Sequence, residues 1–158
     1  MKNIFVKLFT AIILCFSIFL FSSCGKKTFL EKGSGNWKVA SVEIAYYKNF
    51  AATPDSVITF STGDLGIFNF GASQDASFGG VSVNISYPSQ FLHDGWSSTY
   101  TLNQHNSEIL VIVQTFAQNT YNTEITVSGN KKNKQEWLIM SDDFVGNVVT
   151  ETISVEKI

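Results

Sequence analysis

Val81-Ser82-Val83-Asn84-Ile85-Ser86-Tyr87 is the stretch of this sequence that indicates its fold most clearly. Apolar and polar residues alternate strictly along it, so that one face of the segment is apolar and the other is polar. A period of two residues is typical of a β-strand with one buried and one solvated face. The stretch therefore predicts a strand in a sheet that is covered on one side only.

Eight further runs of β-branched and aromatic residues flank this strand. Both prolines of the chain, Pro54 and Pro88, lie between runs, and glycine-containing turn sequences occupy the other gaps. The additional strands are expected at residues 37–47, 56–61, 66–70, 96–102, 108–115, 120–128, 135–140 and 148–155. Short strands at this spacing predict an antiparallel β-sandwich or β-barrel.

The first of these strands changes phase midway. Trp37 and Val39 share one face, whereas the alternate residues from Val42 to Tyr46 share the other. A β-bulge near residues 40 and 41 would bring both sets to the same side, and bulges are how sheets curl into barrels. We expect one domain that spans residues 35–158.

The chain begins with a segment unlike the rest. Lys2 and Lys7 precede an apolar run at residues 8–21, which is shorter than the roughly 20 residues that a membrane-spanning helix needs. A basic start, a short apolar run and small residues at its end are typical of a secretory signal peptide. We assign residues 1–23 to this signal.

Leu20-Phe21-Ser22-Ser23-Cys24 resembles the lipobox of bacterial lipoproteins, although Phe21 stands where the family usually has leucine. The resemblance implies cleavage before Cys24, lipidation of Cys24, and a polar tether over residues 24–34. Two or more acyl chains, palmitate among them, would anchor the protein firmly in a membrane. Gly25 is not an acidic retention signal, which favours the outer membrane of a Gram-negative cell envelope.

Cleavage before Cys24 would leave nine lysines, no arginine and thirteen acidic residues. Nucleic-acid binding is not expected, because arginine and lysine supply most contacts to phosphates and bases. Cys15 would leave with the signal, so that no internal disulfide is possible. The hydrophobic core itself must then stabilise a domain of this size.

Gly35-Asn36-Trp37 at the start of the first strand resembles the G-x-W signature of lipocalins, and the chain is similar to the lipocalin-like (calycin-type) domains of bacterial lipoproteins. The resemblance implies an antiparallel up-and-down β-barrel of about eight to nine strands. Gly35 would let the chain enter the barrel, and Trp37 would close its base. Lipocalins place an arginine over this tryptophan, for which Lys157 is the counterpart here.

Aromatic residues on different predicted strands can point into one interior. A barrel of eight strands either fills with side chains or holds one small ligand, and the sequence leaves both alternatives open. If the barrel is hollow, we expect an apolar ligand to contact Phe60, Phe68, Phe70, Trp96, Tyr100 and Tyr121. If it is filled, we expect an interaction or structural lipoprotein that acts through its loops on another envelope protein or component.

Candidate catalytic groups are few. His93 and His105 lie in predicted turns, and no third residue has the spacing of a metal ligand. The serines lie on strands or loops without a nucleophile elbow. We therefore expect no enzyme, no metal and no cofactor.

Overall fold

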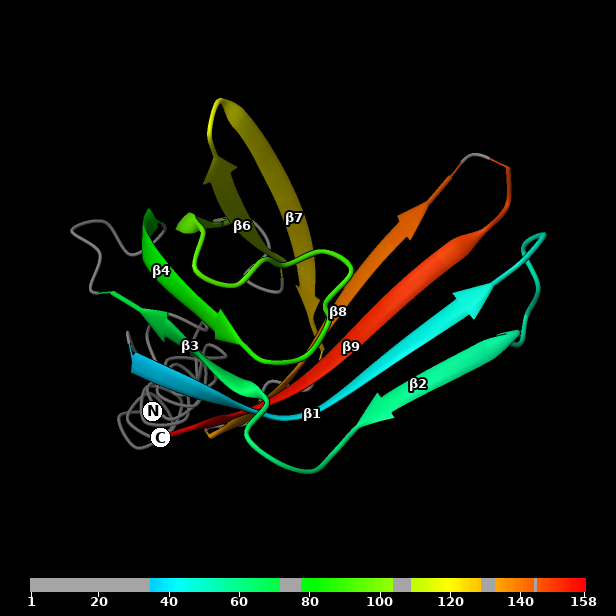
Figure 1. Cartoon of the computed structure of the whole chain (residues 1–158), viewed down its shortest axis with the longest axis horizontal. Coiled ribbons are helices and arrows are strands. Elements are labelled where there is room, and N and C mark those ends of the chain that lie inside the picture. The colour runs from blue at the N-terminus through cyan, green and yellow to red at the C-terminus, as the bar shows by residue number, and fades with distance from the viewer. Residues whose placement is uncertain (1–34, 72–77, 104–108, 129–132, 144) are drawn as a thin grey trace, which may run out of the picture.

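The computed structural model describes residues 35–71, 78–103, 109–128, 133–143 and 145–158. Within these residues the chain forms strands and no helix, which confirms the predicted all-β class (Figure 1). The strands are β1 (Gly35–Tyr47), β2 (Ser56–Phe60), β3 (Gly66–Phe70), β4 (Phe78–Ile85), β5 (Ser97–Leu102), β6 (Ile109–Phe116), β7 (Asn119–Val127), β8 (Lys134–Asp142) and β9 (Val148–Lys157). The assignments of residues 1–23 and 24–34 lie outside the described part and stay predictions.

The strands close into an antiparallel barrel. From β3 to β9 each strand pairs with the next along the chain, and β9 pairs with β1 to close a ring of eight strands. β2 is an additional strand that pairs with β1 over Val42–Tyr46, while β3 pairs with β1 over Gly35–Lys38. β2 and β3 thus lie end to end along one edge of β1. The predicted up-and-down barrel of eight to nine strands is confirmed.

The bulge in β1 is also confirmed. The register between β1 and β9 shifts between Val39 and Ser41, so that Val39 and Val42 are both buried although three positions separate them. In β4 buried and exposed residues alternate, as its sequence predicts. β4 begins at Phe78, three residues earlier than the sequence pattern indicates.

The two ends of the barrel differ. At one end, which we call the base, β1 begins at Gly35 and β9 ends at Lys157 (Figure 1). At the other end β7 and β8 separate, because they pair only at Thr126 with Leu138 and at Val127 with Trp137. The β6–β7 hairpin leans to one side, whereas β8, β9, β1 and β2 continue together to the other, as in a V. We call this second end the splayed end.

Candidate binding site at the splayed end

Three of the six residues that we expected to contact a ligand belong to the hydrophobic core. Phe68, Phe70 and Tyr100 are at most 1% exposed. The ring of Phe70 lies 5.1 Å from that of Tyr100 and 5.9 Å from that of Trp137, and the Phe68 ring lies 4.9 Å from Trp137. These rings pack against each other in the edge-on and tilted arrangements that aromatic pairs prefer. The lower part of the barrel is therefore filled with side chains.

Trp37 belongs to the same filled region. It is fully buried, and in the sheet it lies between Phe68 of β3 and Lys157 of β9. Gly35 begins β1 at the base, opposite Phe70. The structural role that the lipocalin resemblance implies for both residues stays a prediction. Cys24 and His105 lie outside the described residues.

Of the other three residues, Trp96 and Tyr121 lie at the splayed end, whereas Phe60 pairs with Val42 and packs, half-buried, against the core. Trp96 and Tyr121 come together there, with ring centroids 5.4 Å apart. Phe60, the last residue of β2, lies apart from them, and its ring is 6.2 Å from that of Tyr87. The structure thus divides the expected set between the core and the splayed end.

Trp96 is the middle of a stack of three rings. His93 lies on one side at 4.0 Å with an interplanar angle of 23°, and Phe116 lies on the other at 4.8 Å with an angle of 16°. Tyr121 approaches from the edge, 6.2 Å from the His93 ring. We call these four residues the ring column. Sequence reasoning missed His93 as a ring in this stack and did not consider Phe116.

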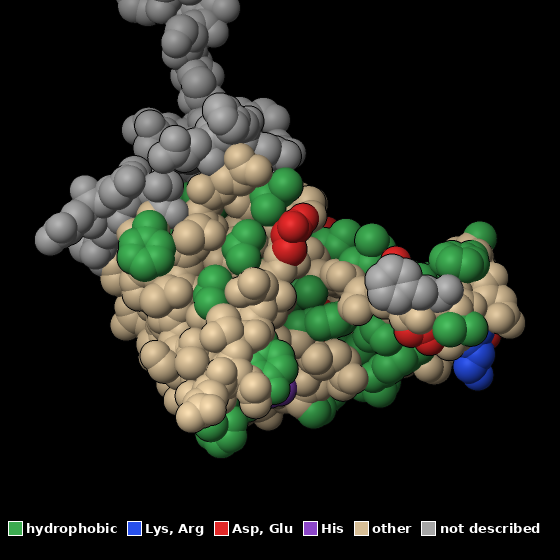
Figure 2. All heavy atoms as spheres, turned by 90° about the horizontal axis from the view of Figure 1, so that it is seen from above, with side chains coloured by type: hydrophobic (Ala, Val, Ile, Leu, Met, Phe, Trp, Pro, Cys, Tyr) green, Lys and Arg blue, Asp and Glu red, His purple; other side chains and the backbone are tan. Residues whose placement is uncertain are grey.

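The outer members of the ring column face solvent. Phe116 is 58% exposed and Tyr121 is 46% exposed, while Trp96 and His93 are half-buried. Figure 2 looks onto the splayed end from above and shows separate hydrophobic side chains among backbone and uncharged side chains, with charged groups at a few places. Large aromatic side chains that are ordered and exposed are typical of binding surfaces.

The barrel beneath the ring column is covered by the connection between β4 and β5. This connection, residues 86–96, crosses the splayed end, and we call it the cap segment. Its Leu92 is only 2% exposed and joins the hydrophobic core. The cap segment also carries His93 and Trp96, so the position of the ring column depends on how this segment is held.

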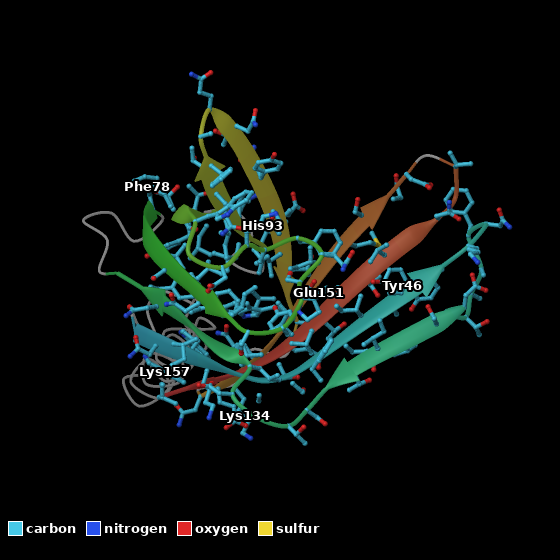
Figure 3. The ribbon with its side chains drawn as sticks, viewed as in Figure 1. Tyr46, Phe78, His93, Lys134, Glu151 and Lys157 are labelled. Carbon is cyan, nitrogen blue, oxygen red and sulfur yellow. The ribbon has the colours of Figure 1, made fainter. Side chains whose placement is uncertain are left out.

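One buried carboxylate on β9 holds the start of the cap segment (Figure 3). Glu151 is fully buried and accepts hydrogen bonds from the hydroxyl of Tyr87 at 3.0 Å, from that of Ser89 at 2.8 and 2.9 Å, and from the backbone N–H of Gln90 at 3.0 Å. A buried charge is tolerated only when it is paired or hydrogen-bonded in this way. Glu151 therefore connects the barrel wall to the cap segment through hydrogen bonds.

Two further polar side chains hold the rest of the cap segment. Gln114 of β6 is fully buried: its Oε1 accepts from the backbone N–H of His93 at 2.8 Å, and its Nε2 donates to the His93 carbonyl at 2.8 Å and to Ser98 Oγ at 3.1 Å. Thr123 of β7 donates to the carbonyl of Phe91 at 3.1 Å. The backbone under the ring column is thus fixed from two strands.

Burial changes the acidity of this network. It raises the pKa of Glu151 above its usual value of 4.5, although the hydrogen bonds from Gln90, Ser89 and Tyr87 act in the opposite direction. Burial, together with the neighbouring Glu151 carboxylate, raises the pKa of Tyr87 far above its usual value of 10.0. The phenol of Tyr87 therefore stays protonated and acts as a donor.

A signal for the cap network is present in the sequence. Glu151, Gln114 and Thr123 occupy inward positions in strands whose other inward residues are apolar, for example Ile153 and Val155 beyond Glu151. A polar residue at an inward position needs a hydrogen-bond partner. Three such residues on three strands indicate a polar partner inside the barrel, which is the cap segment.

A hollow on the outer wall of the barrel lies beside the β1 bulge, away from the splayed end. Ser41, Gln135 and Ser154 contribute to its lining, with Lys134 and Glu156, which form an ion pair of 2.5 Å at its edge. Both charged side chains are largely exposed, and exposed pairs contribute little energy. This hollow adds no convergent set of groups to the site.

The described residues contain neither a cluster of metal ligands nor a membrane-spanning helix. No group of three or more histidine, cysteine, aspartate or glutamate side chains in that part of the chain is placed to hold a metal ion. Over the same residues, no helix has the length and apolar character to cross a membrane.

Comparison with known proteins found no relatives. No family model matches the chain, and no curated protein or solved structure matches it.

Proposed function

We propose that this protein is a non-catalytic, lipid-anchored binding protein of the bacterial cell envelope that engages another envelope component through its splayed end. One observation carries the proposal. Aromatic side chains fill the lower barrel and the cap segment covers it, whereas the ring column stands exposed at the splayed end. Binding by this fold therefore takes place on the splayed end rather than deep inside the barrel.

The position of Gly35 supports the same function. β1 begins at the base, so a tether from Cys24 joins the domain at the end opposite the ring column. Gly35 lies eleven residue steps beyond Cys24, and an extended chain spans at most about 3.6 Å per step, so the base would lie within about 40 Å of the membrane. The splayed end would face away from the bilayer. The Gly25 that follows Cys24 favours the outer membrane of a Gram-negative cell.

The chemistry of the described residues supports a non-catalytic role. Glu151 is the carboxylate buried beneath the splayed end, and its two oxygens already accept the hydrogen bonds that hold the cap segment. General acid–base catalysis needs a group that can reach a proton of the substrate. Glu151 is closed off from solvent and is engaged in structure.

A small apolar ligand is the second candidate function, and the adjacency of Trp96 and Tyr121 favours it. Small-molecule sites normally enclose most of the ligand surface. Because the lower barrel is filled, such a ligand would have to contact Trp96 and Tyr121 at the splayed end. Mass spectrometry of compounds that co-purify with the protein tests this candidate, and one stoichiometric apolar species would favour it over the first.

The anchor is tested by labelled palmitate. The full chain is expressed in a Gram-negative host as wild type, as Cys24→Ala and, as a matched control, as Cys15→Ala. We expect label on the wild type and the control and none on Cys24→Ala. Undiminished labelling of Cys24→Ala would contradict the anchor.

The binding surface is tested by a photoreactive amino acid placed at one of two exposed aromatic positions of the anchored full chain. Tyr121 lies at the splayed end and is 46% exposed, and Phe78 lies near the base and is 54% exposed. We expect crosslinks to one envelope component from position 121 and not from position 78. Crosslinks from neither position, or equal crosslinks from both, would refute the proposed surface.

A further inference from the structure

The surroundings of the ring column contain no charge over two long stretches of sequence. Residues 95–103 and 109–123 include no lysine, arginine, aspartate or glutamate, although 15% of the chain is charged. The second stretch forms β6, the turn and most of β7, and it supplies the exposed Phe116 and Tyr121. Its other exposed side chains are mostly amides and hydroxyls. Asn119 pairs with Phe116 and shares a face with Phe116 and Tyr121, and Gln118 precedes it in the turn. Thr115, Thr120 and Asn122 alternate with the rings and lie on the opposite face of the hairpin.

From this combination we infer that the ring column and the β6–β7 hairpin bind a neutral carbohydrate chain. A pyranose ring has an apolar face of C–H groups and an edge of hydroxyl groups. The C–H face packs on the exposed rings of Phe116 and Tyr121, because the face of an aromatic ring is electron-rich and the C–H groups are slightly positive. The hydroxyl groups of the sugar exchange hydrogen bonds with the amides of Asn119 and Gln118, which are both donors and acceptors.

Other ligands with flat or apolar faces fit less well. Nucleobases stack on aromatic rings, but their phosphates need cations, and the hairpin has neither lysine nor arginine. An anionic sugar would likewise lack a cation on the hairpin. A purely apolar ligand would gain nothing from the amides beside the rings and would remain half in water. A neutral sugar satisfies both the rings and the amides.

The ring column is also preorganised. Gln114 fixes both the N–H and the carbonyl of His93, and His93 stacks on Trp96. At the turn of the hairpin Ala117 has a φ of +54°, a left-handed conformation that L-residues other than asparagine and glycine rarely adopt. Unfavourable backbone conformations that persist are concentrated at functional sites. A surface held in this way loses little conformational entropy when a ligand binds.

Tryptophan fluorescence offers a selective test, because the chain has three tryptophans and only one is accessible. Trp37 and Trp137 are fully buried, whereas Trp96 is half-buried in the ring column. Iodide therefore quenches Trp96 selectively. All described strands and core residues lie within 35–158, so a chain that starts at residue 24 with Cys24→Ser contains the whole barrel.

The probes are four neutral hexasaccharides, namely those of β-1,4-glucose, α-1,4-glucose, β-1,4-xylose and α-1,6-mannose, with hexagalacturonate as the charged counterpart. We expect at least one neutral probe to protect Trp96 from iodide below about 1 mM, and hexagalacturonate to give no protection. By calorimetry, Phe116→Ala and Tyr121→Ala should each weaken binding about tenfold. Phe78→Ala near the base is the matched control and should leave binding unchanged.

The inference is overturned if no neutral probe protects Trp96 at 10 times that concentration, if the charged probe protects equally well, or if both alanine variants bind like the wild type. It rests on the proposed function, and the crosslinking from positions 121 and 78 described above separates the two failures. Crosslinks from position 121 without protection by any neutral probe would reject the carbohydrate and keep the splayed end as a binding surface. Neither crosslinks nor protection would count against both.

Discussion

The buried Glu151 makes the cap segment testable by stability measurements. Glu151→Ala removes the acceptor of three donors, which are the hydroxyls of Tyr87 and Ser89 and the N–H of Gln90. A buried donor left without a partner costs about 1–3 kcal/mol. We therefore expect Glu151→Ala to lower the free energy of unfolding by about 3–5 kcal/mol, which is a large part of the stability of a domain of this size.

Two milder variants separate the hydrogen bonds from the volume of the side chain. Tyr87→Phe keeps the ring and removes one hydrogen bond to the carboxylate, for which about 1.5–3 kcal/mol is expected. Because that bond requires Glu151, the cost of Tyr87→Phe should fall below about 0.5 kcal/mol in the Glu151→Ala background. Glu156→Gln is the matched control on the same strand: its exposed pair with Lys134 contributes less than about 1 kcal/mol.

The pH dependence has a definite sign. Because burial raises the pKa of Glu151, the folded state binds a proton more tightly than the unfolded state does. Its protonation therefore stabilises the fold fully below about pH 4.5, and this contribution is lost as the pH rises through the raised pKa. Glu151→Gln cannot titrate at this position. The free energy of unfolding of the wild type, taken relative to that of Glu151→Gln, should therefore increase as the pH falls toward 4.5.

Urea unfolding from pH 4 to pH 8, followed by circular dichroism, measures all of these quantities. Parallel stability curves for wild type and Glu151→Gln would refute the assignment of a raised pKa to this carboxyl. If Tyr87→Phe lowers the free energy of unfolding as much in the Glu151→Ala background as in the wild type, the two side chains are not coupled. Glu151 would then not hold the cap segment through Tyr87. Iodide quenching of Trp96 adds an independent readout, because release of the cap segment should expose this ring.

Three further predictions concern single positions. A Cβ at Gly79 would lie 2.8 Å from the ring of the buried Tyr100, so Gly79→Ala should cost about 1–3 kcal/mol in urea unfolding, whereas Gly80→Ala, which meets nothing within 4 Å, should be nearly neutral. Ala117→Gly should raise the unfolding free energy by about 0.5–1 kcal/mol, because glycine adopts the positive φ without strain; a loss would contradict that strain. Gln114→Leu should cost at least about 2 kcal/mol and increase iodide quenching of Trp96, because it leaves two backbone groups unpaired; unchanged quenching would show that Gln114 does not position the ring column.

Local patterns in the sequence were sufficient to predict the barrel wall. The alternation in residues 81–87 places a strand with one buried face, and the change of phase after Val39 places the bulge between β1 and β9. Both depend only on the period of the side chains along one strand. Trp37 is buried as its surrounding pattern predicts. These features need no knowledge of what lies across the barrel.

The ring column could not be predicted in the same way, because it depends on contacts between separate segments. Trp96 ends the cap segment, Phe116 ends β6 and Tyr121 lies on β7, and no pattern in one strand relates their positions. The early separation of β7 and β8 was also not predictable, since both sequences are suitable for pairing along their whole length. That separation is what leaves the ring column uncovered.

The choice between a hollow and a filled barrel follows from where the polar inward residues lie. Toward the base the inward residues are apolar and aromatic apart from Gln135, which accepts a hydrogen bond from Trp137, and they pack against one another. At the splayed end Gln114, Thr123 and Glu151 face inward, and an empty apolar cavity would leave all three without partners. The cap segment supplies those partners through its backbone and hydroxyl groups, and in doing so it presents His93 and Trp96 outward. The same three residues that close the barrel to a ligand therefore build the surface on which we place binding.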